Sequence, residues 1–261
     1  MSMLKKIQRG RTPKPPRILI YGVEGIGKST VGSQAPKPIF IQTEDGLDEI
    51  DCDRFPLATT FDEVAAALSE LHSEKHDYQT VVIDSLDWLE RLIWDDLCRQ
   101  YNVASIEKVD GGYAKGYTHA LTHWRQILTA LGCLRNDRGM VVICIAHSKV
   151  EKFEDPETSA YDRYSPRLHK HAAALVCEWS DAVLFATRKF RTQSEDAGFG
   201  RKRAIAAPIG SGGGERILRC VGGPSCIAKN RYGLPDELPL SWEAFVTALS
   251  QQQNQGVKTN G

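Results

Sequence analysis

Long apolar runs are missing from this chain of 261 residues. None approaches the roughly 18 residues that a membrane-spanning helix needs, so we expect no membrane segment. The amino-terminal sequence also lacks the apolar stretch of a secretory signal. An excess of one charge is absent too, because Lys+Arg and Asp+Glu both number 33. A balanced charge gives no overall field that attracts a polyanion, and any nucleic-acid contact must therefore come from local basic patches.

Cysteine usage excludes a disulfide framework. The seven cysteines are an odd number, and no two of them have the C-x-x-C spacing. This pattern is typical of reduced thiols, and we expect a cytoplasmic protein. Hydrophobic residues make up 41% and charged residues 25% of the chain. Both values are typical of soluble globular proteins and exclude a largely disordered or collagen-like chain.

Composition divides the chain into three parts. Residues 1–16 are basic, contain no acidic residue and hold three prolines, which predicts an extended flexible arm. Such an arm is either solvated, or touches a phosphate backbone or a neighbouring subunit. Residues 17–250 have the patterning of one folded domain. The polar residues 251–261 are expected to form a disordered tail.

Strands and helices alternate through the domain. Nearly continuous apolar runs predict strands at 17–21, 38–42, 80–84, 140–146 and 180–186. Helical patterns occur at 62–71, 86–101, 118–134 and 241–249, with Ser85 as the expected cap of the second. Residues 188–216 suggest a hairpin, and 217–220 and 226–228 suggest edge strands. The fold class is therefore α/β, a mostly parallel sheet with helices on both faces and a β-hairpin region towards the C-terminus.

One glycine-rich turn carries a specific chemical signal. Residues 22–29 (GVEGIGKS) match G-x-x-x-x-G-K-[ST], and a strand precedes and a helix follows them. Backbone N–H groups of such a loop cradle phosphates, the lysine reaches the β- and γ-phosphates, and the hydroxyl binds Mg²⁺. The expected nucleotide-binding residues are Gly22, Val23, Glu24, Gly25, Ile26, Gly27, Lys28, Ser29 and Thr30.

Polar side chains end the neighbouring strands, where ligands of parallel sheets bind. Asp84 closes an apolar strand and is the expected second metal ligand beside Ser29. No glutamate follows Asp84, so hydrolysis needs another base to orient water. Glu44 is the leading candidate for that base, with Asp45 as its rival, and His147 is a candidate sensor of the γ-phosphate.

Together these segments resemble the RecA/DnaB-type branch of P-loop ATPases. The matching pieces are the phosphate loop and residues 42–48 (QTEDGLD), 82–85 (VIDS), 145–147 (IAH) and 228–235 (AKNRYGLP). The resemblance implies a RecA-like P-loop NTPase core. It also implies that Lys229 and Arg231 are fingers that reach the nucleotide of the next subunit, in a ring or filament of identical chains.

The order of the motifs, with residues 112–117 (GYAKGY) among them, is similar to that of phage-encoded RecA-like ATP-binding proteins, some of them single-strand annealing proteins of the Sak-four type. This resemblance implies ATP and Mg²⁺ as cofactors and single-stranded DNA as partner, in recombination, annealing or replication. A single-strand binding or replication protein would be a further partner, in the cytoplasm of a bacterial host. Loops 102–117 and 148–170 would line the DNA channel.

Two other functions fit part of the pattern. A small-molecule or nucleotide kinase would use Arg163 and Arg167 as an arginine-bearing lid, but leaves residues 42–48 and 228–235 unexplained. A nucleotide-gated adaptor that does not hydrolyse its nucleotide is compatible with Ser85 in place of a glutamate after Asp84. Glu44→Gln separates the adaptor from an ATPase, because only an ATPase has turnover to lose.

Overall fold

A ten-stranded sheet organises the described part of the chain, which comprises residues 3–7, 9–10, 12–196, 202–208 and 214–258 of a computed structural model. Its strand order is β12-β10-β7-β1-β5-β4-β2-β3, with β6 paired to β5 and β11 paired to β7. The parallel strands are β1 (Arg17–Gly22), β2 (Pro38–Gln42), β3 (Asp53–Arg54), β4 (Thr80–Asp84), β5 (Val141–Phe153) and β7 (Ala182–Arg188). The antiparallel strands are β6 (Tyr161–Pro166), β10 (Arg216–Arg219), β11 (Lys229–Asn230) and β12 (Glu237–Pro239).

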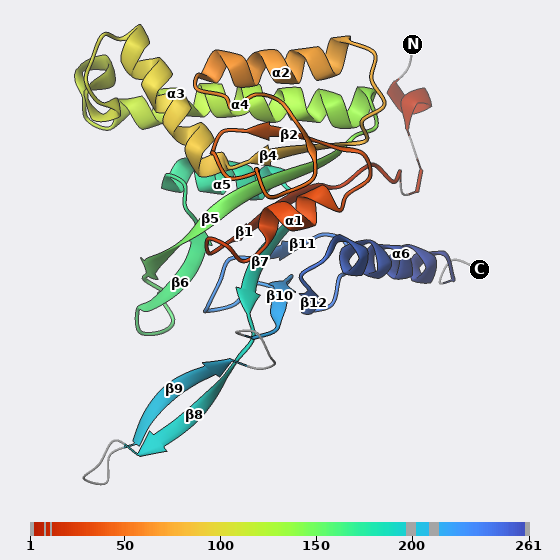
Figure 1. The fold of residues 1–261 in the computed structure, drawn as a ribbon, viewed down its shortest axis with the longest axis vertical. Coiled ribbons are helices and arrows are strands. Elements are labelled where there is room, and N and C mark those ends of the chain that lie inside the picture. Colours follow the sequence, from red (N-terminus) through yellow and green to blue (C-terminus); the bar gives the residue numbers. More distant parts are fainter. Residues whose placement is uncertain (1–2, 8, 11, 197–201, 209–213, 259–261) are drawn as a thin grey trace.

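Helices cover both faces of this sheet (Figure 1). One face packs against α2 (Phe61–Ser73), α3 (Leu86–Gln100), α4 (Lys115–Asp137) and α5 (Lys170–Trp179). The other face packs against α1 (Lys28–Ser33) and α6 (Trp242–Lys258). The central strands are buried on both sides, which explains why they are apolar throughout. The expected α/β fold class is confirmed.

The register of the central strands brings the predicted site residues to one edge. β5 lies between β1 and β4, with Gly22 opposite His147 and Asp84 opposite Ile145. Across β1 and β7, a Cβ on Gly22 would lie 2.3 Å from the Ala186 carbonyl oxygen, so only glycine fits there. The carboxyl ends of β1, β5, β4 and β2 therefore meet beside the phosphate loop.

The strand that ends near His147 is longer than predicted. β5 continues to Phe153 and pairs with β6 as an antiparallel hairpin, where the sequence suggested a loop from residue 148 onward. The charged residues of this stretch hid the strand, because the hairpin extends beyond the core and alternates between exposed and half-buried positions. The other expected channel loop, 102–117, contains the 3₁₀ helix η2 (Ile106–Gly111) and the start of α4.

The predicted hairpin within 188–216 is confirmed as β8 (Phe190–Asp196) and β9 (Lys202–Pro208). Figure 1 shows this ribbon projecting away from the sheet and its helices. Residues 197–201 and 209–213 of the predicted segment lie outside the described residues. The strand expected at 226–228 is displaced to β11, two residues long.

Both ends of the chain differ from expectation. α6 continues to Lys258, so most of the predicted disordered tail is helical, because its glutamines favour a helix. The last three residues lie outside the described residues. The amino-terminal arm contains the 3₁₀ helix η1 (Met3–Lys6). Lys14 and Pro15, at the end of the arm, are attached to α4. Arg135 Nε donates to the Pro15 carbonyl (2.6 Å), and Lys14 Nζ donates to Asn136 Oδ1 (2.8 Å). No helix among the described residues is long and apolar enough to cross a bilayer.

Candidate functional site

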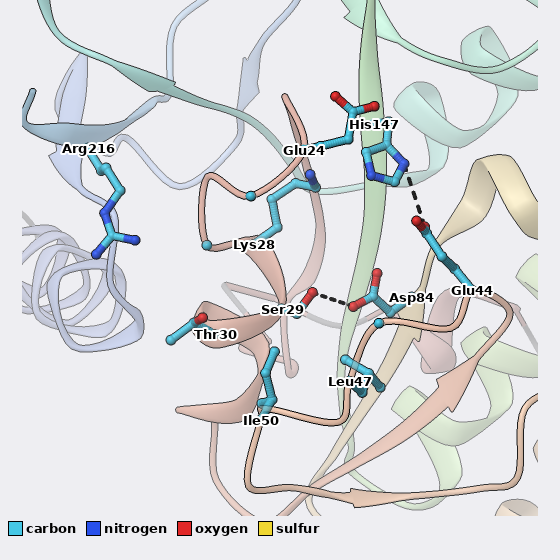
Figure 2. A pocket seen from close by; sticks show the side chains of 13 residues that line it. Glu24, Lys28, Ser29, Thr30, Glu44, Leu47, Ile50, Asp84, His147 and Arg216 are labelled. Carbon is cyan, nitrogen blue, oxygen red and sulfur yellow. Dashed lines mark hydrogen bonds and ion pairs between the residues drawn. The ribbon is translucent and has the colours of Figure 1, made fainter. Parts of the chain in front are cut away.

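A cavity of about 340 Å³ lies at the carboxyl ends of the central strands (Figure 2). Six of the nine predicted phosphate-loop residues line it: Glu24, Gly25, Gly27, Lys28, Ser29 and Thr30. The other three contribute differently. Gly22 and Val23 offer carbonyl oxygens to Lys28, and the Ile26 side chain is buried in the core beneath the loop. Glu44, Asp84 and His147 line the same cavity, so the structure brings these predicted residues together.

The backbone of the loop curls through conformations that favour glycine. Gly25 has φ 67° and Gly27 has φ 106°, both in the left-handed region. Gly27 is also the N-cap of α1, so that the free N–H groups of the first helical turn adjoin the cavity. Lys28 Nζ donates to the Gly22 carbonyl (3.1 Å) and to the Val23 carbonyl (2.9 Å). Burial lowers the pKa of Lys28, and nearby Asp84 opposes that effect.

A hydroxyl and a carboxylate face each other at the floor of the cavity. Ser29 Oγ donates to Asp84 Oδ2 at 2.5 Å, although the two residues are 55 positions apart. Asp84 is 8% exposed, and burial raises its pKa, while the Ser29 hydrogen bond and Lys28 lower it. Oxygen ligands of this kind suit Mg²⁺, which binds through one or two carboxylates and the phosphates of its substrate. The donor set therefore fits the metal that the motif implies.

Glu44 occupies the place expected for a base. It follows the end of β2, its side chain is 30% exposed, and Ser85 Oγ donates to its Oε2 at 2.9 Å. Ser85 is the N-cap residue of α3, as expected, but its side chain makes no cap hydrogen bond, because the hydroxyl donates to Glu44 instead. Asp45 is exposed and does not line the cavity, which favours Glu44 over its rival.

His147 is held by a buried carboxylate that the sequence reasoning missed. Asp87 accepts from the His147 backbone N–H (3.0 Å), contacts His147 Nδ1 (3.0 Å) and accepts from Arg167 Nη2 (2.8 Å). Burial raises the pKa of Asp87, but the hydrogen bonds from His147 and Arg167 outweigh it and hold the pKa well below its usual range. His147 Nδ1 lies 3.7 Å from Glu44 Oε2, which Figure 2 marks.

Arg167 connects this cluster to the phosphate loop, since its Nη1 donates to Glu24 Oε1 at 3.1 Å. Arg167 is one of the two arginines that the kinase hypothesis assigned to a lid. It binds Asp87 and Glu24 and does not line the cavity. The sequence signal for Asp87 was its position, three residues after Asp84. No motif marked Arg167 for this position.

Lys229 and Arg231 do not reach the cavity of their own chain. β11 pairs with the first residues of β7, beside the start of β1, whereas the phosphate loop follows the end of β1. Lys229 Nζ donates to the Cys177 carbonyl (2.9 Å) and to the Glu178 carbonyl (2.7 Å) at the end of α5. The Arg231 side chain is 53% exposed and lies 3.4 Å from Asp181.

The two segments expected to line a DNA channel meet in the structure. Tyr117 stacks on His169, with ring centroids 4.1 Å apart. Tyr113 is 97% exposed, while two cations of the β5–β6 segment have partners within the chain and Lys152 is exposed. Lys149 donates to the Leu168 carbonyl, and Arg163 pairs with Glu151. Basic and aromatic residues at 148–170 are thus less available than the sequence implied.

The site combines a phosphate loop on a parallel sheet with the Ser29–Asp84 pair and a second acid, Glu44. This combination defines a P-loop nucleotide-binding protein. The family model for the AAA domain matches residues 14–232, so the chain belongs to the AAA domain family. This membership confirms the coarser part of the resemblance, a P-loop ATPase family whose members bind nucleotides.

Two individual proteins are similar to the chain. The SPbeta prophage-derived uncharacterized protein YorG of Bacillus subtilis (strain 168) is 27% identical over 172 residues, which are 64% of this chain and 49% of that protein. The chain thus spans about half the length of that curated relative. Among solved structures, the crystal structure of the RadB recombinase has a TM-score of 0.47 and 12% identity, over 88% of this chain and 90% of that one.

Proposed function

We propose that the chain binds and hydrolyses ATP with Mg²⁺ and acts on single-stranded DNA in phage-type recombination, annealing or replication. The observation that carries the proposal is the convergence of Lys28, the Ser29–Asp84 pair and Glu44 on one cavity. Residues 17–250 would form the RecA-like ATPase unit. A relative named as prophage-derived supports the phage context and, with it, the cytoplasm of a bacterial host.

In this proposal, Lys28, Ser29, Asp84 and Glu44 have separate tasks in the cavity. Lys28 exchanges the Gly22 and Val23 carbonyls for phosphate oxygens, since a buried ammonium gains more from an anion than from neutral acceptors. Ser29 and Asp84 would hold Mg²⁺, which would supply positive charge against that developing on the phosphates. Glu44 accepts a proton from the attacking water, and the Ser85 hydroxyl fixes the orientation of its carboxylate.

Arg231 is the better placed of the two proposed fingers. Its guanidinium is half exposed and makes a single long contact with Asp181, whereas the Lys229 ammonium donates to two carbonyls that end α5. Asp181 also pairs with Arg17 and Arg135 and would keep these partners when Arg231 leaves. We therefore propose that Arg231 is the main finger that reaches the nucleotide of the neighbouring subunit, in a homo-oligomeric ring or filament.

The DNA contact is assigned to Tyr113 and the lysines around it. Tyr113 is almost fully exposed, and Lys108 and Lys115 are exposed on the same short segment, where Lys115 also pairs with Asp110 at 3.4 Å. An aromatic ring with neighbouring cations suits single strands, because stacking contributes about 1–3 kcal/mol per base and tolerates any sequence. A single-strand binding or replication protein would be a further partner.

Phosphate release from ATP tests the proposal, measured over a range of protein concentrations with and without single-stranded DNA. A finger that acts in trans requires association, so the activity per chain should rise with concentration, and DNA should stimulate it. Tyr113→Ala should lose the stimulation and keep the basal rate, while Tyr101→Ala, also an exposed tyrosine, should keep both. Hydrolysis that is independent of concentration and of DNA contradicts the proposal.

A further inference from the structure

The cavity has two chemically different ends. Glu44, Asp84 and His147 lie at one end, where the proposed function places the γ-phosphate and the metal. Arg216 lies at the other end, beyond the phosphate loop in Figure 2, and Thr30 lies between the two ends. A triphosphate that spans the loop from the acidic end must therefore direct its nucleoside towards Arg216.

Arg216 is held beside the loop by its own strand. It is the first residue of β10, opposite Arg188 of β7, and its carbonyl accepts the Leu240 N–H at 3.1 Å. Its Nη1 donates to the Ile26 carbonyl at 3.3 Å. A Cβ on Gly27 would lie 3.0 Å from Nη1, so the glycine at the N-cap of α1 leaves the space that the guanidinium occupies.

Among the described residues, Arg216 has no acidic partner. Within the described part of the chain, no ion pair joins Arg216 to an aspartate or glutamate, in contrast to Arg219 on the same strand, which contacts Glu237 at 3.7 Å. One of its N–H groups meets a neutral carbonyl, and its side chain lines the cavity with further donors on the planar guanidinium. An unpaired guanidinium at the rim of an anion site is suited to a phosphate oxygen.

We propose that Arg216 binds the nucleoside end of the nucleotide, at the α-phosphate and ribose. The inference rests on the proposed function, because the placement of the γ-phosphate beside Glu44 fixes which end reaches Arg216. β7 and β10 also lead into and out of the β8–β9 ribbon, so the nucleoside end lies at the base of that projection. Arg216 is a residue missed by motif reasoning, since it follows the hairpin in a stretch with no recognisable pattern.

Calorimetric titration with ATP, ADP and inorganic pyrophosphate, each with Mg²⁺, tests this assignment. Arg216→Ala should weaken ATP and ADP by the same factor, about tenfold or more for a lost charge-assisted hydrogen bond. Binding of pyrophosphate, which supplies only the β- and γ-phosphates, should be unchanged. Arg219→Ala, the matched control on β10, should bind all three as the wild type does.

Each other outcome has a distinct meaning. Unchanged ATP and ADP affinity in Arg216→Ala overturns the assignment and leaves the proposed function intact. An equal loss for pyrophosphate overturns it too, because Arg216 would then contact the β- or γ-phosphate. Failure of the wild type to bind ATP contradicts the proposed function, and this inference with it. Unfolding curves of both variants show whether a loss of binding reflects a loss of fold.

Discussion

Replacement of Asp87 by asparagine tests the cluster that holds His147. Asp87 is 4% exposed and accepts hydrogen bonds from His147 and Arg167. The amide keeps one acceptor oxygen but loses the charge. The contacts with His147 and with Arg167 therefore lose their charge assistance, and each is worth about 1.5–3 kcal/mol. Since the Arg167 side chain is 38% exposed and can be rehydrated, we expect Asp87→Asn to lower the free energy of unfolding by about 3 kcal/mol.

Urea unfolding at pH 7 measures this loss, with Asp95→Asn, an exposed position on the same helix, as the control. The control should stay within about 0.5 kcal/mol of the wild type. The pKa of Asp87 is lowered from 3.8 in the folded state, so its contribution is complete above that value and is lost as the pH falls towards the folded-state pKa. The difference between wild type and Asp87→Asn should therefore persist from pH 7 to about pH 5 and shrink below pH 4. A loss under about 1 kcal/mol at pH 7 refutes the reasoning.

Three further predictions concern hydrolysis, assembly and pH. Glu44→Gln should keep ATP affinity and lower the hydrolysis rate by about 100-fold or more, and an unchanged rate would exclude Glu44 as the base. Arg231→Ala and Lys28→Ala should each be inactive alone but active when mixed, because one supplies the site and the other the finger; no recovery on mixing contradicts a finger in trans. Burial raises the pKa of Glu90 from 4.5 to about 7, so the free energy of unfolding of the wild type should fall by up to about 3 kcal/mol as the pH rises between these values. Glu90→Gln should remove this slope in urea titrations, and an identical slope in both proteins argues against the raised pKa.

The sequence predicted the parts of the site that depend on local patterns of residues. The phosphate loop is contiguous, and Asp84 and Glu44 follow apolar strands whose parallel pairing brings strand ends to one edge. His147 followed from the same rule. The fold class followed from the alternation of buried strands and amphipathic helices, because burial on both faces of a parallel sheet demands apolar runs.

The parts that escaped prediction depend on contacts between distant segments. Asp87 and Arg167 are 80 positions apart, and Arg216 approaches a carbonyl 190 positions earlier. No spacing rule reports such pairs. The β5–β6 hairpin was missed for a related reason, because strands that extend beyond the core carry charged residues and lose the apolar signal.

Calorimetric titration of the wild type and of Lys28→Ala with Mg²⁺ and ATP tests the central claim most directly. The claim is that the loop at 22–29 and the acids beside it form one nucleotide site. The account predicts one ATP bound per wild-type chain, affinity that falls when Mg²⁺ is removed, and no measurable binding by a folded Lys28→Ala variant. A wild type that binds no ATP, or a variant that binds it as tightly, would contradict the account.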